Sequence, residues 1–119
     1  MEKIGLDWAI IVFNYMHTGA RYVSNCLDGK VDEGALVSDS NVVINKCAFI
    51  LQYFQECFEG LKAYTTEDGS IVTFRPDLNA ERMMDSCARL EMPQFPKERF
   101  LEAVDKTVRA NAAWVPPYG

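Results

Sequence analysis

Arg82 is the residue in this sequence best suited to binding an anion. It falls early in a predicted helix, just after an exposed turn, so we expect free backbone N–H groups and the positive end of the helix dipole nearby. A guanidinium in such surroundings can hold a phosphate group through two parallel hydrogen bonds. The alternative is a solvated arginine that pairs with Asp85 or Ser86, and the residue pattern leaves both open.

Gly60 interrupts the apolar, strand-forming run "CFEGLKAY" at residues 57–64. A glycine there costs about 0.5–1 kcal/mol relative to alanine, so the position predicts either an unusual backbone angle or a close approach to the main chain. Four aromatic side chains bracket the glycine, namely Tyr53, Phe54, Phe58 and Tyr64. Such residues usually belong to the core, and otherwise they would form an apolar wall beside bare backbone.

No complete catalytic set can be assembled from residue spacing. The sequence contains neither a phosphate-binding glycine loop nor a serine nucleophile motif. The acidic pair Glu56 and Glu59 is typical of a surface that faces water. The four cysteines, Cys26, Cys47, Cys57 and Cys87, are too widely spread to predict a disulfide framework or a metal site.

The length and composition indicate one globular domain that spans residues 1–119. Of these residues 49% are hydrophobic and 24% are charged, which is ordinary for a soluble protein. The net charge of −5 argues against a nucleic-acid partner. The longest apolar run, "WAIIVF", is too short to span a membrane and does not resemble a secretory signal, so we expect a cytoplasmic protein.

Turn residues and hydrophobic periodicity predict the elements that hold these side chains. Strands are expected at 10–17, 21–27 and 41–44, and the last of these is expected to be buried. One or two helical turns are expected at 48–54. The stretch 28–34 is predicted to be turn and loop, with Asp28-Gly29 as a strong turn pair. A β-hairpin is expected over 61–75, with its turn at Asp68-Gly69.

Two helices follow, at 77–92 and 96–114, and either Asp77 or Asn79 can cap the first. The first helix is expected to pack through its core stripe, which consists of Ala80, Met83, Cys87 and Leu90, and the second through Phe100, Val104 and Val108. Strands followed by helices predict an α+β fold, an antiparallel β-sheet with two main helices packed on one face.

Several motifs in order resemble branched-chain amino acid aminotransferases. They are "CFEGLKAY", "EDGSIVTFRPDLNAERM" and "ARLEMP", flanked by "FNYMHTGARYVSNCLDGKVDEGALV" and "VRANAAWVPPYG". The resemblance covers nearly the whole chain and implies the small amino-terminal domain of an enzyme that uses pyridoxal 5′-phosphate. Such enzymes are homodimers that bind the cofactor between a small and a large domain and exchange the amino group of leucine, isoleucine or valine with 2-oxoglutarate.

The resemblance also implies roles for individual residues. Arg82 matches the arginine that binds the cofactor phosphate, and Tyr53, Phe58 and Phe13 match the walls of the pocket for the substrate side chain. Lys62 matches a basic residue near the substrate carboxylate, although a solvated lysine fits that position nearly as well. Gly60 lies where the backbone would pass close to cofactor and substrate.

Two departures from the family pattern concern substrate preference and activity. Gln52 and Phe54 flank Tyr53 where the family commonly has a histidine and a small residue, so Phe54 could narrow the pocket or point into the core. The large domain, with the lysine that binds the cofactor covalently and carries the proton, has no counterpart in these 119 residues. We therefore expect the chain to be inactive alone, and to bind no cofactor firmly without that domain.

Three hypotheses remain on the sequence alone. The chain is the small domain of a branched-chain aminotransferase, with the carboxy-terminal domain and a second copy as partners. It is instead a non-catalytic remnant that dimerises or binds another subunit. Or it is the small domain of a D-amino acid aminotransferase or an aminodeoxychorismate lyase, which the long opening segment disfavours. Under the first hypothesis the isolated chain should expose an apolar face.

Overall fold

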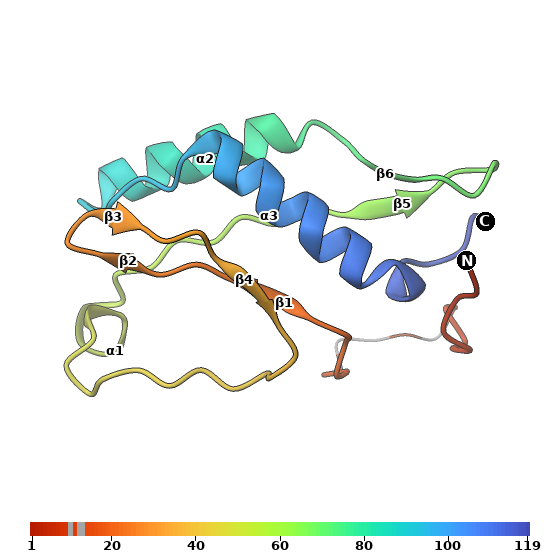
Figure 1. Ribbon diagram of the computed structural model, residues 1–119, viewed down its shortest axis with the longest axis horizontal. Helices are drawn as coiled ribbons and strands as arrows, with labels where there is room; N and C mark the ends of the chain where they lie inside the picture. The colour runs from red at the N-terminus through yellow and green to blue at the C-terminus, as the bar shows by residue number, and fades with distance from the viewer. Residues whose placement is uncertain (10, 12–13) are drawn as a thin grey trace.

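The computed structural model describes residues 1–9, 11 and 14–119, and it confirms the predicted α+β class. The elements in chain order are β1 (Arg21–Val23), β2 (Cys26–Leu27), β3 (Lys30–Val31), β4 (Ala35–Val37), α1 (Phe49–Tyr53), β5 (Ala63–Thr65), β6 (Ile71–Thr73), α2 (Pro76–Arg89), α3 (Lys97–Ala110) and the 3₁₀ turn η1 (Ala112–Trp114). Helices α2 and α3 lie together on one side of strands β1 to β4, and the β5–β6 hairpin lies at the end of the molecule where both termini meet (Figure 1).

Within the described residues the strands form three antiparallel pairs, β1–β4, β2–β3 and β5–β6, and not one continuous sheet. The strand predicted at 21–27 is broken after Val23. There the carboxylate of Asp32 accepts hydrogen bonds from the Ser24 hydroxyl at 2.9 Å and from the Asn25 backbone N–H at 3.0 Å, which replaces ladder pairing. Part of the predicted loop 28–34 is strand β3.

Local turn chemistry explains the two hairpins. Asp28 and Gly29 have φ of 51° and 74°, the left-handed geometry of a tight two-residue hairpin turn between β2 and β3. In the predicted turn of the β5–β6 hairpin, Gly69 has φ of 84°, and the carboxylate of Asp68 accepts a hydrogen bond from the Ser70 backbone N–H at 3.0 Å. Both turn pairs were predicted correctly.

The prediction of a buried strand at 41–44 is wrong. Val43 is 96% exposed, Val42 is 69% exposed, and the segment has no regular structure. A strand needs a neighbour for its backbone hydrogen bonds, and no described strand pairs with this one. Residues 11 and 14–17 of the first predicted strand likewise have no regular structure, and residues 10, 12 and 13 lie outside the described part of the chain.

The two main helices occur where they were predicted, with different ends. Helix α2 begins at Pro76, and neither Asp77 nor Asn79 caps it; Arg75 occupies the cap position in the left-handed region, with φ of 48°. The Asp77 carboxylate instead accepts hydrogen bonds from the Arg75 guanidinium, which lowers its pKa to about 2. Helix α3 ends at Ala110, and η1 continues to Trp114.

The core is thin. Among the described residues, the buried apolar side chains are Ala80, Cys87, Ala112 and Val115. None of the residues of α3, all of which the structure describes, is buried, although Phe100, Val104 and Val108 line one face of that helix. Of the stripe predicted on α2, Ala80 and Cys87 are buried, while Leu90 is 39% exposed. In the described residues no helix is both long and apolar enough to cross a lipid bilayer.

Asn111 joins the amino-terminal segment to the end of α3. Its Oδ1 accepts a hydrogen bond from the Ala20 N–H at 2.9 Å, and its Nδ2 donates to the Ala20 carbonyl at 2.6 Å. The side chain thus pairs with both backbone groups of Ala20, as a neighbouring strand would. Gly19 fits closely beside it, because a Cβ there would lie 3.1 Å from Oδ1 of Asn111.

We expect Asn111→Ala to lower the free energy of unfolding by about 2 kcal/mol, because two partly buried backbone groups lose their partner. Urea denaturation followed by circular dichroism measures the change. Asn41→Ala is the matched control, since the Asn41 side chain is exposed and bonds only to nearby Asp39, and its effect should stay within about 0.5 kcal/mol. Equal losses in both variants would contradict the role given to Asn111.

Candidate functional site

Arg82 projects from the second turn of α2 and binds the carboxylate of Glu59. Its Nε donates to Oε1 at 2.9 Å and its Nη2 donates to Oε2 at 2.8 Å. The Arg82 side chain is 61% exposed, whereas that of Glu59 is 11% exposed. The hydrogen bonds from Arg82 hold the pKa of Glu59 below its ordinary value, and those to Glu59 raise the pKa of Arg82. Glu59, rather than Asp85 or Ser86, is therefore its partner.

Asn79, one turn before Arg82 on α2, completes this arrangement. Asn79 is buried, and its Nδ2 donates to Oε2 of Glu59 at 2.8 Å and to the Gly60 carbonyl at 3.0 Å. Helix α2 thus holds both the side chain of Glu59 and the backbone of Gly60. We call these three side chains the Glu59–Asn79–Arg82 cluster.

The free donors of Arg82 suit an anion such as phosphate. The bonds to Glu59 use Nε and one hydrogen of Nη2, so Nη1 and the second hydrogen of Nη2 can bind a ligand from the solvent side. The carboxylate of Glu59 balances the charge of the guanidinium, so the geometry favours binding through directed hydrogen bonds over attraction between net charges. The free backbone N–H groups and the dipole at the start of α2 contribute less to anion binding than expected, because Arg82 lies about 9 Å along the helix axis from Pro76.

The segment from Gln55 to Thr65 is extended, and its side chains alternate between two environments. Cys57, Glu59 and Leu61 are partly covered, while Phe58, Gly60 and Lys62 are exposed. Alternation of this kind puts successive side chains on opposite faces of an extended chain. Phe58, Gly60 and Lys62, all predicted to contact substrate, therefore share the outward face, and Glu59 points the other way toward α2.

Gly60 has room around it in this structure. Its φ is not positive, and a Cβ at this position would meet only the Phe58 ring, at 3.4 Å, among the described atoms. Neither backbone strain nor internal packing accounts for the glycine here. A close approach from outside the described chain remains the prediction that explains it.

Tyr53 and Phe54 lie in a different depression from Phe58. Together with Phe49, Gln55 and Leu90 they line a cavity of about 460 Å³ beside α1. Phe54 ends α1 with φ of 52°, a left-handed geometry that suits a small residue, and its ring is 79% exposed. Of the two orientations considered for Phe54, burial in the core is excluded. Gln52 is also exposed, and Phe13 lies outside the described residues.

Lys62 precedes β5 and lies beside the carboxy-terminal segment. The two line a cavity of about 970 Å³ that extends from Lys62 to Tyr118 and Gly119. The Thr65 hydroxyl donates to the Pro116 carbonyl at 2.6 Å, which fixes that segment along β5. The described residues thus bring Arg82, Glu59 and Gly60 together, and Phe58 lines a cavity of about 670 Å³ with Glu59 and Gly60. Tyr53 and Lys62 lie in two other depressions.

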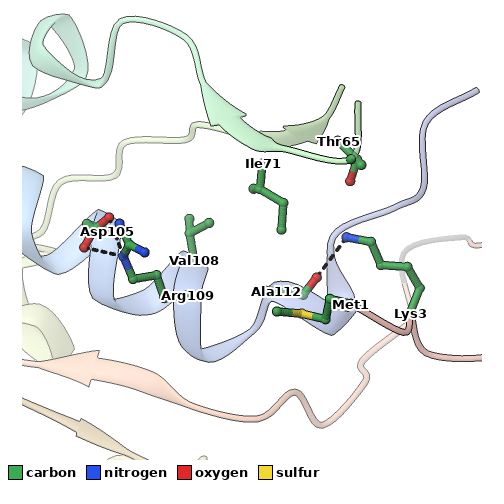
Figure 2. Close-up of a pocket in the computed structure, with 9 residues that line it drawn as sticks. Met1, Lys3, Thr65, Ile71, Asp105, Val108, Arg109 and Ala112 are labelled. Carbon is green, nitrogen blue, oxygen red and sulfur yellow. Dashed lines mark hydrogen bonds and ion pairs between the residues drawn. The ribbon is translucent and has the colours of Figure 1, made fainter. Parts of the chain in front are cut away.

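A further cavity of about 520 Å³, shown in Figure 2, contains none of the predicted site residues. Ile71, Val108 and Met1 surround it with apolar surface. Its charged groups are engaged elsewhere, because Lys3 Nζ donates to the Ala112 carbonyl at 3.1 Å and Arg109 pairs with Asp105 at 2.9 Å within α3. This cavity is a gap between the amino-terminal residues, the β5–β6 hairpin and α3, and its lining does not suit an anion.

Sequence reasoning missed the roles of Glu59 and Asn79. Glu59 was interpreted as one of two acids that face water, and Asn79 as a possible helix cap. The available signal was the position of Glu59 directly before Gly60, where its side chain must alternate to the face opposite to that of Phe58.

Sequence comparisons connect this chain to known proteins. No family model matches the chain. The chain is 48% identical over 114 residues to a branched-chain-amino-acid aminotransferase of Haemophilus influenzae. This match covers 96% of the chain and 33% of that relative. It is 40% identical over 113 residues to the enzyme of the same name from Helicobacter pylori, covering 95% and 33%. It is also 40% identical over 115 residues to a methionine aminotransferase of Arabidopsis thaliana, covering 96% and 32%.

The relatives named here are all aminotransferases, and this is the class to which the chain is related. Within the class, the chain is similar over nearly its whole length to branched-chain aminotransferases, as its motifs indicated. The chain spans about a third of the length of the curated relatives it matches.

Proposed function

We propose that the chain supplies the phosphate-binding and apolar part of the active site of a branched-chain aminotransferase. In the full-length protein this enzyme would exchange the amino group of leucine, isoleucine or valine with 2-oxoglutarate. The observation that carries the proposal is the exposed guanidinium of Arg82, which Glu59 fixes beside Gly60 in a chain related over its length to aminotransferases.

Each residue has a defined task under this proposal. Arg82 binds the phosphate of pyridoxal 5′-phosphate, and Glu59 and Asn79 hold its guanidinium and the Gly60 backbone in register. The bare backbone at Gly60 allows cofactor and substrate to approach. By the family resemblance, Phe58, Tyr53 and Phe13 exclude water from the substrate side chain and Lys62 attracts the substrate carboxylate, although Tyr53 and Lys62 line other cavities than Phe58 in this chain. The cofactor, when bound, supplies the electron-withdrawing ring on which amino transfer depends.

A carboxy-terminal domain and a second subunit are the partners that this proposal requires. The accessible surface of the chain is 9203 Å², whereas a compact protein of this mass exposes about 6,500 Å². Exposed aromatic side chains such as Phe58, Phe54 and Phe74, at 88%, 79% and 83%, contribute to this excess. Additional polypeptide, absent from these 119 residues, would cover such a surface. A cytoplasmic location, where unpaired cysteines stay reduced, completes the proposal.

A methionine-type substrate is the second candidate. It is favoured by the relative named as a methionine aminotransferase, which matches 96% of the chain. Methionine and leucine present similarly sized apolar side chains, so the same aromatic walls could accept both.

A pair of matched ligands tests the proposal on the chain itself. We expect weak but saturable binding of pyridoxal 5′-phosphate that inorganic phosphate displaces, and still weaker binding of pyridoxal, which lacks the phosphate. Equilibrium dialysis measures both. We also expect no amino transfer from leucine to 2-oxoglutarate by the 119 residues alone, because the cofactor-binding lysine is missing. Equal affinity for the two ligands would contradict the phosphate site, and turnover by the chain alone would contradict the need for the second domain.

A further inference from the structure

Two thiols from different elements are in contact next to the Glu59–Asn79–Arg82 cluster. The Sγ atoms of Cys57 and Cys87 lie 3.5 Å apart, and Sγ of Cys57 lies 3.1 Å from Sδ of Met83. Cys57 belongs to the inward face of the extended segment and is partly covered, while Cys87 is on α2 and is only 6% exposed. The two cysteines are 30 residues apart in sequence, so the fold itself creates this contact.

Both thiols are reduced in the structure, and their surroundings do not suit a metal ion. Among the described residues no group of three His, Cys, Asp or Glu side chains is placed to bind one. Two sulfur atoms in van der Waals contact need only a small movement to bond. Neither the phosphate site nor the apolar walls of the proposed enzyme use them, so this inference stands independently of the proposed function.

We propose that Cys57 and Cys87 form a redox modification site, which a peroxide converts to an intramolecular disulfide and which a thiol such as glutathione reduces again. The disulfide would connect the segment before Gly60 covalently to α2. Cys57 reacts first, because it is less covered than Cys87.

The reaction balances with hydrogen peroxide as the oxidant. The sulfur of Cys57 attacks one peroxide oxygen, the O–O bond breaks, and the departing oxygen takes up a proton to leave as water. The sulfur of Cys87 then attacks the resulting sulfenic acid. The S–S bond forms, the S–O bond breaks, and the released hydroxide takes the Cys87 proton to leave as a second water. The two sulfur atoms together lose two electrons, and the two oxygen atoms of the peroxide gain them.

The surroundings of Cys57 make this reaction slow at neutral pH. Burial, the neighbouring Cys87 thiol and the carboxylates of Glu56 and Glu59 raise the pKa of Cys57 to about 11, even though Arg82 pairs with Glu59. Because the thiolate is the reactive form, the oxidation rate should rise about tenfold per pH unit between pH 7 and 9. The site therefore responds to sustained oxidation and not to brief exposure.

Peptide mapping after peroxide treatment at pH 8 tests the proposal, with free thiols blocked by alkylation. In buffer we expect Cys57–Cys87 to be the main disulfide formed by Cys57, and we expect its loss on addition of glutathione. In concentrated urea, the unfolded chain should instead form the Cys47–Cys57 disulfide about fivefold more often than the Cys57–Cys87 disulfide. Cys47 and Cys57 are much closer in sequence, so the loop between them is easier to close. The same distribution in buffer and in urea, or Cys57 bonded mainly to Cys47 in buffer, would overturn the proposal.

Two variants sharpen the test. Cys87→Ser leaves Cys57 without the thiol that contacts it, so we expect severalfold more irreversible sulfinic acid on Cys57 than in the parent chain. Cys26→Ser removes an exposed thiol that lies outside the pair and should leave the Cys57–Cys87 yield unchanged. Equal amounts of sulfinic acid on Cys57 in Cys87→Ser and in the parent would count against the proposal. If Cys87→Ser does not fold, the comparison of buffer with urea on the parent chain still decides.

Discussion

Arg82→Ala is expected to weaken the binding of pyridoxal 5′-phosphate and of inorganic phosphate about 10- to 100-fold, since hydrogen bonds to charged groups contribute about 1.5–3 kcal/mol. The substitution removes the free donors on Nη1 and Nη2, and it also leaves the Glu59 carboxylate without its counter-charge. An unpaired carboxylate beside the site would repel a phosphate. Isothermal titration with each ligand measures the loss.

Two variants separate a specific role of Arg82 from a general effect of charge. Arg82→Lys should recover only part of the affinity, because an ammonium group cannot form two parallel hydrogen bonds. Arg109→Ala removes another exposed and ion-paired arginine, in α3, and should leave phosphate binding unchanged. If Arg109→Ala lowers the affinity as much as Arg82→Ala does, phosphate is attracted by the overall charge and Arg82 is not its ligand.

Ala80→Glu should lower the free energy of unfolding by more than about 3 kcal/mol, because it places an unpaired carboxylate in the interior. Ala80 is 1% exposed and lies beside Asn79 on α2, so the larger side chain has no route to solvent without displacing the helix. In so thin a core, a loss of this size amounts to much of the total stability. Urea denaturation monitored by tryptophan fluorescence measures the effect.

Ala88→Glu is the matched control for Ala80→Glu. It makes the same chemical change on the same helix at an exposed position, and we expect a loss of no more than about 1 kcal/mol, which reflects helix propensity and the helix dipole. Similar unfolding midpoints for the two variants would mean that α2 does not pack through the face that carries Ala80.

Local chemistry made some of the fold predictable. The turns at Asp28-Gly29 and Asp68-Gly69 follow from residues that tolerate left-handed backbone, and α2 begins at Pro76, one residue before the predicted start. The burial of Ala80 and Cys87 follows from helical periodicity in the same way. These features depend on neighbours within a few positions in the sequence.

Features that depend on distant partners were less predictable. Val42 and Val43 have the composition of a buried strand, but the described residues provide no partner, and both side chains are exposed. The ion pair between Glu59 and Arg82 joins positions 23 residues apart, so periodicity could not reveal it. Arg82 was predicted to bind an anion from its helix and its motif, whereas its carboxylate partner is visible only in the structure.

The alternating segment from Gln55 to Thr65 has a consequence for how such a protein can diversify. Glu59 bonds to Asn79 and Arg82 of α2 and is constrained by that helix, while Phe58, Lys62 and Tyr64 are exposed. If the outward set contacts the ligand as we propose, evolution can exchange that set, and with it the preferred ligand, while Glu59 keeps its contacts with α2. In this single stretch of chain, selection on the odd-numbered residues and selection on the even-numbered residues are thus nearly independent.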